Sequence, residues 1–280
     1  TAGVYLRYTK ASISDQMPKL QRHVIETELS PAAKERYHKA LTDIQGYIAE
    51  RKAGMPLPDQ INFAGVVFKL PKKKPPAAEL MITSALKSIL DRDKVAQARD
   101  VIEELLQLHP RLLVGTWRRE SAAQLIKELA SLDVPKWGPV TGKTDWDKRI
   151  EAANEFAASE RGIYIATRGA VGISINHLSA AHAGLQITPD WNPDSNLQFE
   201  GRFHRKGCPH DEVHSYYMLC PGTLDDHIID LIGSKGEEAR SISAEDKEGY
   251  SLAADLNPTG FSGEAWSMEE IMALLPEVET

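Results

Sequence analysis

Two arginines in the stretch from Gln198 to Gly207 have the residue type and the spacing for phosphate chemistry. Arg202 and Arg205 follow Gly201 and stand three positions apart, so on a helix both side chains would share one face. Guanidinium groups match phosphate oxygens, and a positioned arginine can stabilise the charge of a phosphoryl group in transfer. A solvated basic helix is the alternative interpretation, and this segment alone leaves both open.

A weaker pattern in the same region has the residue types of a metal site. Four residues resemble zinc ligands in their order: Cys208, His210, His214 and Cys220. Their spacing matches no usual zinc site, and His214 lies in a strand-like run. We therefore expect ordinary strand and surface residues here, and no metal. Two cysteines are also too few for a disulfide framework and indicate a reducing compartment.

The elements that would position these residues alternate between strands and helices from residue 111 onward. Strands are predicted at 111–115, 162–166, 183–188 and 213–219, with a short segment at 139–141. Helices are predicted between or after them, at 121–132, 145–158 and 223–232. This alternation is typical of an α/β domain whose parallel sheet is covered by helices on both faces.

A helical extension precedes this α/β domain. Ser30 and Pro31 have the residue types of a helix cap and a first helical position, and they predict a helix over 31–51. Residues 55–76 are expected to form a loop, followed by two helices at 77–90 and 94–108. The chain is thus divided into a junction (1–30), a helical segment (31–108), the α/β lobe (109–232) and an acidic linker (233–280) with a short helix near 267–275.

The charge is distributed unevenly along the chain. The formal net charge is −7, but residues 233–280 hold three basic and eleven acidic residues, which leaves the remainder near neutrality. A local basic groove is therefore compatible with the acidic total. No long uncharged apolar run and no secretion signal is present, so we expect an intracellular protein, cytoplasmic or nuclear, without a membrane segment.

With this order of elements, five segments resemble the conserved motifs of superfamily-two helicases, and specifically of the Swi/Snf-type ATPases. Motif VI of the family is matched by Gln198, Gly201, Arg202, His204 and Arg205, and the Trp-Asn-Pro signature before it by Trp191-Asn192-Pro193. Motifs V and IV resemble the stretches 167–174 and 113–117. A turn and helix of the family are matched by Thr141-Gly142-Lys143-Thr144, Arg149 and Phe156. Residues 1–30 resemble, more weakly, the junction into the family's second lobe, and the layout is nearest to the fork-remodelling, strand-annealing branch.

The resemblance implies a RecA-like C-terminal lobe that closes on Mg-ATP together with a neighbouring N-terminal lobe. That lobe would lie upstream of Thr1 and would hold most of the nucleotide and the metal. The chain has no initiator Met, so we expect a fragment boundary at Thr1. The catalytic residues carried over are Arg202 and Arg205. The implied nucleotide-contacting residues are Gly169, Gly172, Ser174, Gln198 and Gly201. The implied DNA-contacting residues are Thr116, Arg118, Gly142, Lys143, Thr167, Arg168 and Trp191.

Departures from the family pattern put individual contacts in question. The paired glycines of motif V are Gly169-Ala170 here, Ser174 replaces the usual Asn or Thr, and Lys206-Gly207-Cys208 replaces the usual end of motif VI. Gly142-Lys143-Thr144 is not a phosphate-binding loop of the Walker type, because position 137 is Trp where that loop needs a glycine. We expect its backbone amides and Lys143 to contact a DNA phosphate instead.

Three functions remain open from the sequence. The first is the C-terminal half of an ATP-driven translocase on double-stranded or branched DNA, in which the isolated chain is expected to hydrolyse ATP negligibly. The second is a non-catalytic module that binds DNA or a protein, for which the acidic tail would be a docking segment. The third is an RNA helicase of the same superfamily, which the Trp-Asn-Pro signature disfavours.

Overall fold

The computed structural model describes residues 16–56, 58–70, 78–171 and 176–230, together with positions 232, 252, 255 and 256. Gly172, Ser174 and the helix expected near 267–275 lie outside the described residues. Among the described residues, no helix combines the length and the apolar character that a membrane span needs.

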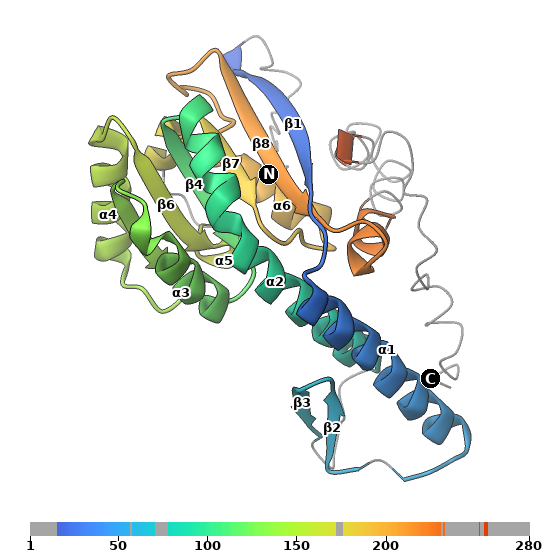
Figure 1. The fold of residues 1–280 in the computed structure, drawn as a ribbon. Coiled ribbons are helices and arrows are strands. Elements are labelled where there is room, and N and C mark those ends of the chain that lie inside the picture. Colours follow the sequence, from blue (N-terminus) through green and yellow to red (C-terminus); the bar gives the residue numbers. More distant parts are fainter. Residues whose placement is uncertain are drawn as a thin grey trace, which may run out of the picture.

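A sheet of six parallel strands forms the centre of the molecule (Figure 1). Its spatial order is β1-β8-β7-β4-β6-β5. The strands are β1 (Lys19–Glu26), β4 (Arg111–Thr116), β5 (Lys136–Val140), β6 (Gly162–Thr167), β7 (Ala183–Gln186) and β8 (Glu212–Leu219). All residues of β6 and β7 are buried, as the runs of apolar residues predict for a sheet covered on both faces. The prediction of a parallel α/β sheet is confirmed.

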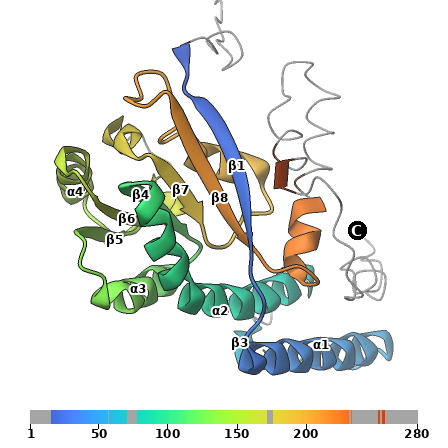
Figure 2. The same ribbon diagram turned by 45° about the horizontal axis from the view of Figure 1, so that its top comes forward.

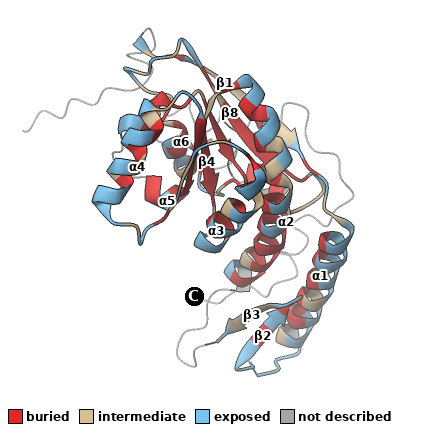
Figure 3. Cartoon of the chain, turned by 60° about the vertical axis from the view of Figure 1, so that its left-hand side comes forward, coloured by how far each residue is buried: buried red, intermediate tan, exposed pale blue. Residues whose placement is uncertain are grey.

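Helices cover both faces of this sheet. One face packs against the C-terminal half of α2 (Ala78–Leu108) and against α3 (Arg119–Glu128), which continues into the 3-10 turn Leu129–Ser131. The opposite face packs against α4 (Trp146–Ala158), α5 (Arg168–Val171), the 3-10 turn Asn176–Ala180 and α6 (Pro193–Glu200). Figure 3 shows the buried strands between these two layers.

The helical extension leaves the sheet as a long antiparallel arm (Figures 1 and 2). α1 (Pro31–Lys52) starts as predicted, with Pro31 at its first turn and the Ser30 hydroxyl accepting a hydrogen bond from the Ala33 amide. It packs on the N-terminal half of α2 and on a hairpin of β2 (Gln60–Phe63) and β3 (Val66–Lys69). The helix formed by residues 224–230 packs into the same core.

Two expectations for this region are wrong. Residues 78–108 form one helix where two were expected, because Asp91 and Lys94, the polar residues around the expected break, are buried and hydrogen-bonded. Residues 55–76 contain the β2–β3 hairpin, whose Ile61 and Phe63 pack against α1 and α2. Both elements depend on distant partners that local sequence does not display.

The edge strand β1 was not expected within the junction 1–30. Its sequence, KLQRHVIE, has no strict alternation, and its burial pattern is mostly intermediate. It forms because the whole strand pairs in parallel with β8, from Lys19 opposite Glu212 to Glu26 opposite Leu219. This long-range pairing fixes residues 19–26 of the junction beside β8.

Two glycines allow α6 and the turn after it to lie close to the sheet. A Cβ atom at Gly115 of β4 would stand 2.7 Å from the Phe199 ring, and one at Gly184 of β7 would stand 2.3 Å from the Phe203 ring. Both phenylalanines are buried. The segment with the two candidate catalytic arginines is therefore anchored on the sheet by Phe199 and Phe203.

Candidate functional site

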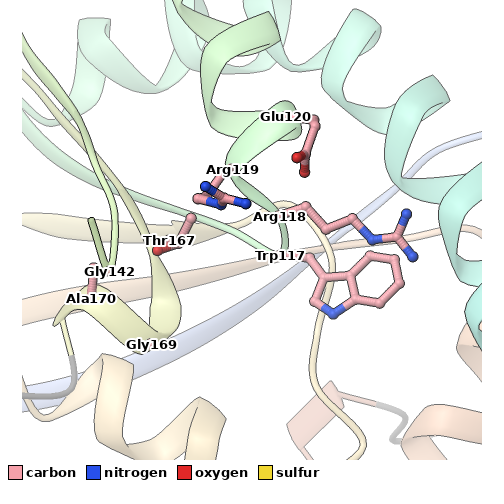
Figure 4. Close-up of a pocket in the computed structure, with 8 residues that line it drawn as sticks. All are labelled: Trp117, Arg118, Arg119, Glu120, Gly142, Thr167, Gly169 and Ala170. Carbon is pink, nitrogen blue, oxygen red and sulfur yellow. The ribbon is translucent and has the colours of Figure 1, made fainter. Parts of the chain in front are cut away.

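A pocket of about 500 Å³ lies where the chain leaves β4 and β6 and turns after β5 (Figure 4). The carboxyl ends of parallel strands are the usual place for ligand sites in α/β sheets. The residues that line it are Trp117, Arg118, Arg119, Glu120, Gly142, Thr167, Gly169 and Ala170. Three of the expected DNA-contacting residues, Arg118, Gly142 and Thr167, are thus brought together from three separate segments.

The turn that carries Gly142 and Lys143 is held in place by a buried arginine. Arg149 of α4 donates from Nε to the Thr144 carbonyl at 2.7 Å and from Nη2 to the Gly142 carbonyl at 3.0 Å. Its Nη1 also reaches the Ala170 carbonyl at 3.5 Å, so one side chain ties the turn to α5. Both Gly142 and Lys143 are exposed at this edge of the sheet. A fixed and exposed turn is suited to backbone contact with a phosphate.

Neither the packing nor the backbone conformation of the fold requires glycine at positions 142 and 169. A Cβ atom at either position would meet nothing within 4 Å, and neither has a positive φ angle. Alanine would therefore fit the folded chain at both sites. Their lack of a side chain instead leaves room for a ligand that approaches the backbone closely.

A cluster of cations and indoles borders the pocket. The Arg118 guanidinium lies 3.9 Å and the Lys87 ammonium 4.8 Å from the centre of the Trp117 ring, and Lys87 lies 6.0 Å from the Trp191 ring. Arg118 Nη1 donates to the Ser88 hydroxyl at 3.0 Å. Within the described part of the chain neither cation forms an ion pair. Such cations attract an anion.

Burial perturbs the amine in this cluster. Lys87 is 3 % exposed, and burial together with the charge of Arg168 lowers the pKa of its ammonium to about 8. The carboxylates of Asp190, Asp225 and Asp91 act in the opposite direction but do not restore the ordinary value. Lys87 comes from α2, outside the recognised motifs, and no local sequence pattern pointed to it.

Arg168 and Thr116 occupy different positions from those expected of DNA contacts. The Arg168 side chain is buried and donates to Asn196 Oδ1 and to Asp190 Oδ2, each at 3.2 Å. The Thr116 hydroxyl is also buried and donates to the carbonyls of Arg118 and Ala166. Both side chains are engaged within the fold, which argues against direct phosphate contact by either.

The two candidate catalytic arginines lie in a turn and not on a helix. α6 ends at Glu200, so the expectation that Arg202 and Arg205 share a helical face is wrong. Their positive charges nevertheless interact. Burial, and after it the charge of Arg205, lowers the pKa of the Arg202 guanidinium. Hydrogen bonds from the Arg202 amide to Phe199 and from the Phe203 amide to Glu200 fix this arginine turn, residues 201–205.

The partners of the arginine turn are mostly neutral oxygens. Arg202 Nε donates to the Gln198 carbonyl at 3.2 Å, and Arg205 Nη1 donates to Asn176 Oδ1 at 2.7 Å. Both arginines are half-buried, and Gln198 is exposed. Within the described residues Arg205 has no carboxylate partner, so its positive charge is available to an anionic ligand.

The arginine turn and the pocket lie at different places on the sheet. Phe203 packs over Gly184 at the start of β7, and His204 contacts Pro18, just before β1, so the turn lies toward the amino ends of these strands. The pocket lies at the carboxyl ends of β4 and β6. Gly169, expected near the nucleotide, lines the pocket instead. The lobe therefore offers two separate surfaces to anionic groups.

The zinc-like order of Cys208, His210, His214 and Cys220 does not correspond to a site. Strand β8 runs between the two cysteines, and Cys208 Sγ is directed to the Ser179 carbonyl. Among the described residues, no group of three or more His, Cys, Asp or Glu side chains is arranged to hold a metal ion.

Comparisons with known proteins agree with the motifs. No family model matches the chain. The ISWI chromatin-remodeling complex ATPase ISW2 of Saccharomyces cerevisiae is 32% identical over 98 residues, which is 34% of this chain and 9% of that protein. The SWI/SNF-related matrix-associated actin-dependent regulator of chromatin subfamily A-like protein 1 of Xenopus tropicalis is 23% identical over 246 residues, 83% of this chain and 22% of that protein. The chain thus spans less than a quarter of either relative.

Solved structures show the same fold. The C-terminal part of the Fun30 ATPase domain superposes with a TM-score of 0.60 at 15% identity, covering 77% of this chain and 89% of that one. The Sulfolobus solfataricus SWI2/SNF2 ATPase core in complex with dsDNA gives 0.57 at 18% identity, covering 96% of this chain and 52% of that one. The chain is similar in sequence and in fold to the C-terminal lobe of Swi/Snf-type ATPases, and the expected RecA-like lobe is confirmed.

Proposed function

We propose that this chain is the C-terminal motor lobe of an ATP-dependent, Swi/Snf-type translocase on double-stranded DNA. The observation that carries the proposal is the presence of two separate cationic surfaces on one RecA-like sheet. One is the pocket with its neighbouring cations, and the other is the arginine turn. A motor that couples nucleotide hydrolysis to movement needs one surface for the nucleotide and another for the track.

The pocket and its border are assigned to the DNA backbone. Arg118, Arg119 and Lys143 supply positive charge, and Gly142 and Thr167 supply an accessible backbone and hydroxyl at the same edge. Trp117 and Ser88 hold Arg118 in place through a cation–indole contact and a hydrogen bond, and Lys87 lies over the same indole. Trp191 lies at the border of the same cluster and is assigned to it. Contacts of this kind read phosphates and carry little base specificity.

The arginine turn is assigned to the nucleotide. Arg202 and Arg205 have the guanidinium chemistry that fits phosphate oxygens, and Arg205 lacks a carboxylate among the described residues. Bound ATP with Mg²⁺ would supply the phosphoryl group whose hydrolysis drives the motor. The chain's own part is to hold two positive charges where negative charge develops during transfer. A neighbouring lobe would hold most of the nucleotide and the metal.

The decisive test is the substitution Arg205→Ala in the complete protein that contains this chain. DNA-stimulated ATP turnover should fall by roughly 10³-fold or more, as expected for a lost arginine finger. Circular dichroism and the melting temperature should change little, because Arg205 is half-buried in a surface turn. The matched control is Arg99→Ala on α2, whose guanidinium pairs with Asp100 and Glu103. Turnover equal to that of the control would contradict the proposal.

The isolated chain should hydrolyse ATP negligibly. It has no Walker-type phosphate loop, and half of the proposed nucleotide site belongs to a neighbouring lobe. Phosphate release by the purified chain, with and without duplex DNA, measures this directly. Robust turnover that disappears with Arg205→Ala would place the whole catalytic site within these residues and refute the two-lobe arrangement.

A non-catalytic DNA-binding module is the second candidate, favoured by the pocket considered alone. It requires salt-dependent DNA binding and no role for Arg202 or Arg205, so the Arg205→Ala measurement decides between the two. Stimulation of turnover by duplex RNA in place of duplex DNA would indicate an RNA helicase. Because the proposed partner is cellular DNA, we propose an intracellular location for the protein.

A further inference from the structure

A buried ion pair lies directly beneath the arginine turn. Glu200, the last residue of α6, is 0 % exposed. Its carboxylate accepts hydrogen bonds from Arg22 Nε at 2.9 Å and Arg22 Nη2 at 2.8 Å, and a third from the Tyr217 hydroxyl at 2.8 Å. Arg22 lies on β1 and Tyr217 on β8, so Glu200 links α6 to the edge of the sheet.

The same glutamate supports the backbone of the arginine turn. Its carbonyl accepts hydrogen bonds from the Phe203 amide at 3.1 Å and from the His204 amide at 2.8 Å. Any displacement of Glu200 is therefore transmitted to the residues between Arg202 and Arg205. A second contact reinforces the link just before the same strand, since His204 Nε2 lies 3.1 Å from the carbonyl oxygen of Pro18.

The chemistry of the pair favours one rigid geometry. Two parallel N–H···O bonds fix the plane of a carboxylate against the plane of a guanidinium. Burial alone would lower the pKa of Arg22, but the hydrogen bonds and charge of Glu200 outweigh it and raise that pKa above its ordinary value. Arg22 therefore stays charged, and removal of one residue of the pair would leave the other in the fold without its partner.

We propose that the Arg22–Glu200 pair positions the arginine turn for catalysis and couples it mechanically to β1. This inference rests on the proposed function, in which β1 belongs to the junction with the neighbouring lobe. A movement of that junction along β8 would shift Arg22, and through Glu200 it would shift the turn that presents Arg202 and Arg205. Arg22 and Glu200 are positioning residues, because they act through the turn and not on the nucleotide.

The test uses Arg22→Met, Glu200→Gln and Arg22→Lys in the complete protein. The first two should lower kcat for DNA-stimulated ATP hydrolysis by about 10- to 100-fold, the range expected when catalytic groups are misplaced by about 1 Å. Arg22→Lys keeps the charge but loses the paired geometry, so its kcat should lie between those of the first two and of the unaltered protein. Duplex DNA affinity should stay within twofold, because the pocket lies elsewhere on the sheet.

The matched control is the ion pair Lys94–Asp225, which is fully buried, with side chains 1 % and 0 % exposed. It joins α2 to the helix at 224–230 and has no contact with the arginine turn. Lys94→Met should lower the melting temperature but leave kcat per folded molecule within twofold. Asp255→Asn removes the exposed partner of Arg22 and should also leave kcat unchanged.

The outcomes separate this inference from the proposed function. Equal kcat losses in Glu200→Gln and Lys94→Met would make the Arg22–Glu200 pair merely structural and overturn the inference. If Arg22→Met and Glu200→Gln do not fold, a folded Arg22→Lys variant with full kcat overturns it equally. If Arg205→Ala retains turnover, the proposed function fails first. If Arg205→Ala is inactive while the pair variants are fully active, only the inference fails.

Discussion

At the scale of single residues, Gly142 is a residue whose lack of a side chain the packing of the fold does not explain. Its φ angle is not positive, and a Cβ atom there would meet nothing within 4 Å. Gly115 and Gly184 behave in the opposite way, because the rings of Phe199 and Phe203 fill the space of their missing side chains. Packing thus explains Gly115 and Gly184 but not Gly142, and the place of Gly142 in the lining of the pocket is what favours a binding role there.

Gly142→Ala is therefore expected to weaken DNA binding without harming the fold. The free energy of unfolding should stay constant or rise by about 0.4–1 kcal/mol, because alanine restricts the unfolded chain. Duplex DNA affinity should fall by roughly 5- to 30-fold, the equivalent of about 1–2 kcal/mol, if a phosphate approaches this backbone closely. Fluorescence anisotropy with labelled duplex DNA and a urea titration measure the two quantities.

Gly46→Ala is the control for this experiment. Gly46 is exposed on α1, and its Cβ would also meet nothing within 4 Å. Alanine inside a helix should stabilise by about 0.8–1 kcal/mol and leave DNA affinity unchanged. Equal DNA affinity for Gly142→Ala and Gly46→Ala would remove Gly142 from the proposed interface.

At the scale of elements, the histidines at the amino end of the sheet form a feature that the proposed mechanism does not use. His23 of β1, His214 of β8 and Tyr216 stack, and His109, before β4, donates to or accepts from the Tyr216 hydroxyl at 2.8 Å. His182 packs against His210 with ring centres 3.8 Å apart. Several imidazoles share a small space, so each resists a positive charge on its neighbours.

This histidine cluster should make the fold sensitive to mild acid. Burial, followed by the charges of neighbouring histidines, lowers the pKa values of His109 and His182 to about 4 and also lowers that of His23. Arg111 adds to the effect at His182, whereas Glu212 opposes it at His23. The unfolded chain, with histidine pKa values near 6.5, binds more protons than the native chain below that pH. Stability should be full above about pH 6.5 and decline toward pH 4.

Between pH 7 and pH 5 each of His109 and His182 should lower the free energy of unfolding by about 1 kcal/mol, after a discount for solvent screening. Together they should lower the melting temperature by roughly 4–8 °C. Differential scanning calorimetry across this range measures it. His109→Gln should flatten the profile, whereas His38→Gln, at an exposed position of α1, should leave it unaltered. A melting temperature independent of pH over this range would contradict the assignment.

The sequence predicted elements well where local signals and burial agree. The strands β4, β6 and β8 and the helices α1 and α4 were expected close to their observed bounds, because apolar runs and Ser30-Pro31 are local features. The edge strand β1 and the β2–β3 hairpin were missed, because they exist through pairing with distant residues. The helical break expected near residue 92 was wrong for a related reason: the buried Lys94 pairs with Asp225, 131 positions away.

The candidate site followed the same rule. The motifs predicted Arg118, Gly142 and Thr167 as site residues, and these three line one pocket. The motifs also predicted Arg202 and Arg205, which lie in one turn. It could not show that Arg168 is bound by Asp190 and Asn196, since its partners depend on the path of the loop after β7. Arg22 and Lys87, which act from other elements, carried no sequence signal at all.

At the scale of the whole molecule, α2 joins the two parts of the chain into one framework. Its N-terminal half belongs to the core of the helical arm, and its C-terminal half covers the sheet (Figure 1). The boundary expected at residue 108 follows a helix that belongs to the cores of both parts. The helical segment and the α/β lobe should therefore unfold together. Lys87, in the N-terminal half of this helix, contacts Trp117, which lines the pocket. The arm and the proposed DNA surface are mechanically connected.

The net charge of the whole molecule should also influence its affinity for duplex DNA, and the acidic C-terminal residues contribute to that charge. The last 23 residues, 258–280, contain five acidic and no basic side chains, so their removal changes the net charge from −7 to −2. Asp255 and the buried Leu252 and Leu256 remain in the shortened chain, which preserves the contact with Arg22. Removal of long-range repulsion should raise duplex DNA affinity several-fold at about 50 mM salt, chiefly through the association rate. The gain should vanish near 0.5 M salt, where screening acts within a few ångströms. Stopped-flow association at both salt concentrations measures this; an equal gain at both would mean that the segment occupies the DNA surface directly and does not act through its charge.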